Sequence, residues 1–126
     1  MRAPLLVLFA AALASVATAC NGTTMETSYP RSAVQPVTAQ PHADGQIALR
    51  YRVFPESSHY SGGVDYERAG DALRIVITRC ALGAPCEPMS RSVIPLDDDW
   101  QAEVHLAYDG GRVVIVHADG EQQVYP

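Results

Sequence analysis

Apolar and polar residues alternate along much of this chain, and that period of two limits the possible folds more than any other feature. Alternation places apolar side chains on one face of a β-strand and polar side chains on the other. No window shows the 3.6-residue period of an amphipathic helix. Four clear and three weaker stretches qualify as strands: residues 47–54, 71–80, 100–108, 113–118, 64–68, 89–96 and 124–125.

The alternation also predicts which side chains face the core. These are the odd-numbered residues from Ile47 to Val53, the odd-numbered residues from Leu73 to Ile77, and the even-numbered residues from Trp100 to Tyr108. The stretch at 113–118 is apolar except for His117, which is typical of a strand covered on both faces.

Three turns join the strand candidates, at Ala69-Gly70, at Asp109-Gly110-Gly111, and between Cys80 and Cys86. Each turn predicts a hairpin in which apolar residues oppose apolar residues. The predicted partners are Tyr66 with Leu73, Leu106 with Val114, and Ile77 with Met89. Residues 46–126 are therefore expected to form an antiparallel meander of about six or seven strands, closed as a small barrel or folded as a sandwich.

Two of the three cysteines are expected to form a disulfide within this domain. A domain of about 80 residues has a marginal core, and small exported domains are usually cross-linked. The spacing of Cys80 and Cys86 differs from the C-x-x-C of thioredoxin-like sites, so a structural bond is favoured over a redox role. The loop that they enclose is apolar, so Leu82 either folds back on the domain or forms a presented contact loop.

The first 19 residues have the pattern of a secretory signal peptide. Arg2 precedes an apolar run from Leu5 to about Val16, and the small residues Ala17-Thr18-Ala19 follow it. The run is shorter than the ~20 apolar residues that a membrane-spanning helix needs.

The junction Ala17-Thr18-Ala19-Cys20 resembles the lipobox of bacterial lipoproteins, although Ala17 stands where Leu is common. The resemblance implies that the Cys20 thiol is acylated, which also explains why one of three cysteines lacks a partner. Asn21 then favours the outer membrane, with the protein facing the periplasm. The same residues fit ordinary cleavage, which would release a soluble periplasmic or secreted protein.

Residues 20–45 are expected to be the lipidated cysteine and a disordered tether. The segment is rich in Thr, Ser, Pro and Gln, and Pro30, Pro36 and Pro41 argue against a helix or a central strand. A segment of this composition buries too little apolar surface to order itself.

The charge and the motifs exclude several functions. Nine arginines stand against 14 acidic residues, which argues against nucleic acid or anionic lipid as the main partner. No nucleophile motif, phosphate-binding loop or H-E-x-x-H motif is present, so we expect neither an enzyme nor a cofactor.

Two groups of side chains are candidate sites. In the hairpin around Gly110, Glu103 would oppose His117 and lie beside His105, and this grouping is suited to Zn²⁺ or Cu²⁺. The alternative is an ordinary polar sheet face.

The second group is a set of arginines expected on one sheet. Arg50, Arg52, Arg74 and possibly Arg91 either pair with Asp65 and Glu67 across strands or, with Phe54 and Tyr60, form a contact surface for a protein partner. The predicted contacts are Arg50, Arg52, Phe54 and Leu82.

These features predict a non-catalytic, lipid-anchored envelope protein whose β domain binds another protein in an inhibitor, immunity or assembly role. In size and layout the chain is similar to small β lipoproteins that inhibit lysozyme, but it carries none of their motifs. The alternative is a periplasmic protein that binds a metal or a small ligand.

Overall fold

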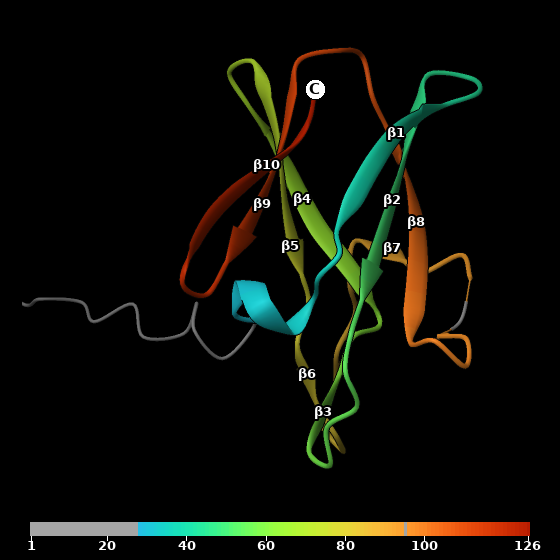
Figure 1. Cartoon of the computed structure of the whole chain (residues 1–126), viewed down its shortest axis with the longest axis vertical. Helices are drawn as coiled ribbons and strands as arrows, with labels where there is room; N and C mark the ends of the chain where they lie inside the picture. Colours follow the sequence, from blue (N-terminus) through green and yellow to red (C-terminus); the bar gives the residue numbers. More distant parts are fainter. Residues whose placement is uncertain (1–27, 95) are drawn as a thin grey trace, which may run out of the picture.

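The computed structural model describes residues 28–94 and 96–126, which form an all-β domain with one short 3-10 turn at Arg31–Ala33 (Figure 1). The strands are β1 (Thr38–His42), β2 (Gln46–Arg52), β3 (His59–Tyr60), β4 (Gly63–Ala69), β5 (Ala72–Ile77), β6 (Cys80–Ala81), β7 (Ser90–Arg91), β8 (Gln101–Ala107), β9 (Arg112–His117) and β10 (Gly120–Tyr125).

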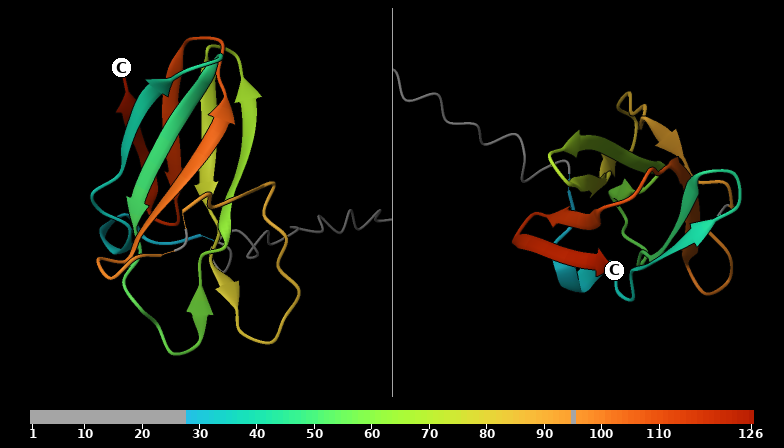
Figure 2. Two further views of the ribbon diagram at one scale, coloured as in Figure 1. Left: turned by 90° about the vertical axis from the view of Figure 1, so that its right-hand side faces the viewer. Right: turned by 90° about the horizontal axis from the view of Figure 1, so that it is seen from above.

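Two sheets face each other across the core (Figure 2). One has the strand order β1-β2-β8 and the other has the order β10-β9-β5-β4-β7. The short strands β3 and β6 pair separately and extend from one end of the molecule (Figure 1). The sheets do not close into a hydrogen-bonded barrel, so the sandwich alternative of the predicted all-β fold is the one observed.

The predicted core faces are confirmed in the four main strands. Ile47, Leu49 and Tyr51 of β2 are buried against Ile75 and Ile115 of the opposite sheet. Their β8 neighbours are also buried, at Ala102, Val104 and Leu106. Trp100 departs from the pattern because it precedes β8 with a positive φ of 62° and is exposed.

The hairpin predicted between residues 100 and 118 does not form. Leu106 of β8 opposes Ile47 of β2, whereas β9 crosses to the other sheet and runs parallel to β5. The physical reason is the burial of β9: Val113 and Ile115 face the core, and Val114 on the outer face lies between Gln123 of β10 and Arg74 of β5, whose long side chains can shield it. Alternation fixes the buried face of a strand but does not identify its neighbour.

The β4–β5 hairpin forms, but its register is shifted by two residues from the predicted one. The turn is at Gly70-Asp71, and Tyr66 opposes Ile75. A shift of two keeps the same side chains on the core face, which is why alternation alone did not detect it.

The segment 89–96 is mostly not a strand. Its two-residue strand β7 pairs with Gly63 and Val64 of β4, so Met89 lies beside β4 and the predicted pairing of Ile77 with Met89 is wrong.

The expected tether does not extend to residue 45, because the chain is already part of the domain at Ser28. Tyr29, Val34 and Ala39 are buried in the core, and β1 pairs with β2 along its whole length. Pro41 is compatible with β1 because β1 is at the edge of its sheet, where one side of the backbone needs no partner.

The signal peptide, Cys20 and residues 21–27 lie outside the described residues. Within residues 28–94 and 96–126, no helix is long and apolar enough to cross a membrane.

The assigned core face predicts a strong difference between a buried and a polar position of β8. Leu106→Ala removes a buried side chain and should lower the free energy of unfolding by about 2–5 kcal/mol. Gln101→Ala, at a polar position of the same strand, should change it by less than about 0.5 kcal/mol. Urea unfolding of both variants measures this, and equal losses would show that the face is misassigned.

The disulfide between Cys80 and Cys86 is present, with Cα atoms 5.8 Å apart. Replacing both residues by Ala should lower the free energy of unfolding by about 2 kcal/mol, since a short closed loop restricts the unfolded chain. Thiol titration of the denatured, unreduced protein checks the bond directly, and two reactive thiols from residues 80 and 86 would contradict it.

Candidate functional site

The edge strands of the two sheets come together on two sides of the sandwich, and the two sides differ. On one side β1 packs beside β10. On the other side β8 and β4 are neighbours but do not hydrogen-bond to each other, and we call the line between them the seam. The seam is visible in Figure 2, where β8 and β4 run next to each other.

Half of the seam is filled by the chain itself. The Ser92 amide donates to the Gly62 carbonyl beside β4 at 3.1 Å, and the Val93 amide donates to the Glu103 carbonyl of β8 at 2.6 Å. Ile94 also forms an isolated antiparallel bridge with Glu103. Residues 90–94 are therefore an extended segment that hydrogen-bonds to both edges of the seam.

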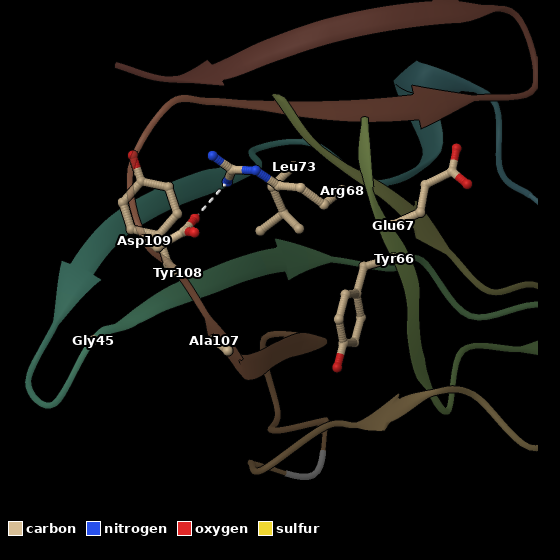
Figure 3. A pocket seen from close by; sticks show the side chains of 8 residues that line it. All are labelled: Gly45, Tyr66, Glu67, Arg68, Leu73, Ala107, Tyr108 and Asp109. Carbon is tan, nitrogen blue, oxygen red and sulfur yellow. Dashed lines mark ion pairs between the residues drawn. The ribbon is translucent and has the colours of Figure 1, made fainter. Parts of the chain in front are cut away.

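The other half of the seam is an open groove (Figure 3). Tyr66 and Leu73 line it from one sheet, and Ala107 and Tyr108 line it from the other. The remaining lining residues are Gly45, Glu67, Arg68 and Asp109. Tyr66 is half-buried and lies at the edge of the core, so the groove has an aromatic and aliphatic wall.

Backbone groups along the groove have no strand partner in the described part of the chain. On β8, the Glu103 carbonyl points away from β2. Because backbone groups of alternate residues point to the same side of a strand, the amides and carbonyls of His105 and Ala107 also point away from β2. On β4, the Gly62 carbonyl and the Tyr66 amide point away from β5, where the Tyr66 amide donates to the Met89 side-chain sulfur at 3.5 Å, and the backbone groups of Arg68 point the same way. The pairing of β4 with β7 ends at Val64.

An ion pair crosses the open end of the groove. The Arg68 guanidinium lies 2.9 Å from the Asp109 carboxylate, with side chains 39% and 84% exposed. An ion pair this exposed contributes little to stability. It therefore presents a weak barrier to a ligand that enters the groove.

The rim of the groove is mainly acidic. Asp109 is exposed and lines the groove, exposed Asp44 precedes the lining residue Gly45, and Arg68 is the one basic residue among those that line the groove. The Glu67 side chain points away from the groove (Figure 3), and its carboxylate lies 3.8 Å from the Arg74 guanidinium. The acidic rim favours a ligand that carries basic residues.

The predicted metal grouping of Glu103, His105 and His117 is wrong, because β8 and β9 are in different sheets. His117 is buried and hydrogen-bonds to Gln122 at 2.9 Å. Glu103 and His105 do lie together on the outer face of β8, 2.9 Å apart. The Arg50 guanidinium holds the pKa of the Glu103 carboxyl below its usual value, and His105 lowers it further.

A second histidine does reach this face, but from β1. The rings of His42 and His105 stack with centroids 4.4 Å apart. The small side chain of Ala48 lies in β2 between the two strands and leaves space for this contact. Alternation did not reveal His42 because β1 was assigned to the tether. Among the described residues, no three His, Cys, Asp or Glu side chains are arranged to hold a metal ion.

The predicted arginine surface is divided between the two sheets. Arg50 lies on the three-stranded sheet and pairs with Glu103, whereas Arg74 and Arg91 lie on the five-stranded sheet. Arg74 pairs with Glu121 at 2.6 Å and with Glu67 at 3.8 Å. These are cross-strand ion pairs rather than one patch for a partner.

The other predicted contact residues lie near the end that carries β3 and β6. The Arg52 guanidinium lies over the Phe54 ring, 4.9 Å from its centroid, and Phe54 is 48% exposed. Leu82 is 60% exposed, so it does not fold back on the domain, and the presented-loop alternative is the one observed.

Three of the groove residues, Tyr66, Leu73 and Tyr108, were assigned to the core face from their alternation. Tyr66 and Tyr108 do face inward, but the two sheets separate where they lie. No sequence signal marks this separation, because it depends on which strands become neighbours.

Comparison with known proteins gives no match: no family model, curated protein or solved structure resembles the chain closely enough to identify it.

Proposed function

We propose that this protein is a lipid-anchored, non-catalytic protein of the bacterial envelope that binds an extended segment of another protein. The segment enters the groove at the seam and adds a strand to the exposed edge of β8. In this mode of recognition the backbone hydrogen bonds supply affinity and alternate side chains supply specificity.

One observation carries the proposal: within the described part of the chain, β8 beyond Glu103 and β4 beyond Val64 have no strand paired to the edges that flank the apolar groove. Natural proteins usually protect such edges with proline, lysine, a bulge or a covering segment. Residues 90–94 cover the seam at one end, and their hydrogen bonds to both edges show that an extended chain fits there.

The groove also indicates the properties of the segment. The open part of β8 runs from Val104 to Ala107, which corresponds to a strand of about four residues and ~13 Å. Alternate residues of the bound segment would face Tyr66 and Leu73, so they should be apolar. Basic residues beside them would meet the exposed Asp109 carboxylate and the nearby turn residue Asp44 at the rim.

The envelope location rests on the sequence. The junction before Cys20 resembles a lipobox, and the disulfide of the domain uses the other two cysteines. Cys20 is therefore the one cysteine left for acylation.

The anchor has a direct test in bacterial cells. Labelling with a fatty-acid analogue should tag the wild-type protein, and Cys20→Ser should release a soluble, untagged protein from the membrane fraction. A mature wild type that carries no acyl chain and fractionates as soluble would contradict the anchor.

The groove is tested by placing a photo-crosslinking amino acid at Ala107 in the full chain, expressed in the envelope. It should give an adduct whose cross-linked peptide is an extended apolar segment with basic neighbours. Tyr66→Arg fills the groove with a charged side chain and should reduce the yield of this adduct about tenfold. A tenfold loss of affinity corresponds to ~1.4 kcal/mol of binding free energy.

The matched control places the same crosslinker at Gln123, an exposed position of the edge strand β10. The Gln123 position should give no such adduct. Equal adducts from both positions, or an Ala107 adduct that persists in Tyr66→Arg, would overturn strand addition at the seam.

A further inference from the structure

The end of the domain that carries β3 and β6 has an unusual composition for an exposed surface. The loop between the disulfide cysteines, Ala81-Leu82-Gly83-Ala84-Pro85, is exposed throughout and contains no charged residue. We call β3, β6 and this loop the arm. Tyr60 of β3 is 39% exposed and Phe54, in the segment leading to β3, is 48% exposed.

The arm holds its apolar tip in a fixed position. The disulfide closes the loop, and the Leu82 amide donates to the Ser58 carbonyl at 3.0 Å. At its base, Arg79 forms two hydrogen bonds with Glu56, at 2.7 and 3.2 Å, so these charges neutralise each other. Because the disulfide and the hydrogen bond already restrict the loop, holding Leu82 away from the core costs no further chain entropy.

The path of the chain places the arm next to the proposed lipid anchor. The described chain begins at Ser28, which forms an antiparallel bridge with Thr78, two residues before the start of β6. Cys20 and Ser28 are eight positions apart in the sequence, so Ser28, which bridges to the base of the arm, lies at most about 28 Å from the acylated residue. Leu82 at the tip is four residues beyond Thr78, which adds at most about 14 Å.

The end of the molecule opposite the arm carries charged turns instead of an uncharged loop. The turns between β1 and β2, between β4 and β5, and between β8 and β9 lie there, away from the arm (Figure 1). These turns carry Asp44, Asp71 and Asp109. Charged turns favour water, and an uncharged loop with an exposed leucine favours the interface between lipid headgroups and acyl chains.

The charged groups near the arm are of both signs. Besides the Arg79–Glu56 pair, Arg52 lies over the Phe54 ring on the β2 side. The acidic run Asp97-Asp98-Asp99 precedes Trp100, whose carbonyl accepts from the Val53 amide, and Glu87 follows the disulfide. The contact therefore rests on the uncharged loop itself, and Arg52 can keep its guanidinium at the headgroups while its stem lies against apolar groups.

We infer that the arm is a second membrane contact, in which Leu82 and its loop insert into the leaflet that holds the Cys20 acyl chains. The contact rests on the proposed anchor, because one shallow loop alone binds a bilayer weakly. It would orient the domain with the acidic turns, and the open end of the seam, away from the lipid.

The experiment uses the acylated mature protein in vesicles of phosphatidylethanolamine and phosphatidylglycerol that contain acyl-brominated lipid. Trp100 is the one tryptophan of the chain, so Trp100→Phe gives a background without tryptophan. Leu82→Trp in that background should lose fluorescence at least about twofold on bromination, since interfacial side chains reach roughly 5–10 Å below the headgroups. The matched control, Asp109→Trp, is at the far end and should be unaffected.

Mass spectrometry of the same sample separates the two proposals. A protein without an acyl chain would refute the anchor and, with it, this orientation. In an acylated protein, equal quenching or no quenching of the two tryptophans would overturn the membrane contact alone. A crosslinker at Leu82 that labels a protein, with no quenching in vesicles, would assign the arm to a protein partner instead. Retained thermal unfolding transitions show that both variants are folded.

Discussion

The burial of β9 between two other strands is the constraint on which the arrangement of this domain depends. Val113 and Ile115 face the core between the sheets, and Val114 is covered on the other face. A strand with apolar residues on both faces is stable only in the interior of a sheet, with neighbours on each side. β9 therefore pairs with β10 and β5, and the connection from β8 must cross from one sheet to the other.

That crossing leaves β8 at the edge of its sheet and creates the seam. Among the described residues, β8 has β2 on one side and contacts from Val93, Ile94 and Asp97 on the other. β4 is in the same position beyond Val64. The proposed binding site is thus a consequence of the core, because the strand that would have covered β8 is needed in the opposite sheet. Tyr66 and Tyr108 then line a groove rather than a closed interior.

The same reasoning separates the two proposed surfaces. The seam supplies unpaired backbone groups with apolar walls and an acidic rim, which are suited to an extended basic segment. The arm supplies uncharged side chains on a loop closed by a disulfide, which are suited to a lipid interface. None of the predicted contact residues Arg50, Arg52, Phe54 and Leu82 lines the groove at the seam, and Arg50 belongs to a cross-strand ion pair.

The sequence by itself determined the all-β fold, the buried face of each main strand and the disulfide, because period-two alternation and cysteine spacing are local properties. Only the tertiary structure decided which strands are neighbours, as the separation of His117 from His105 and the stacking of His42 on His105 show. It also showed that β1 belongs to the fold, since an edge strand tolerates Pro41. Which strands become neighbours depends on the burial summed over the whole core. A register shift that keeps the same apolar face buried cannot be detected from the alternation within one strand.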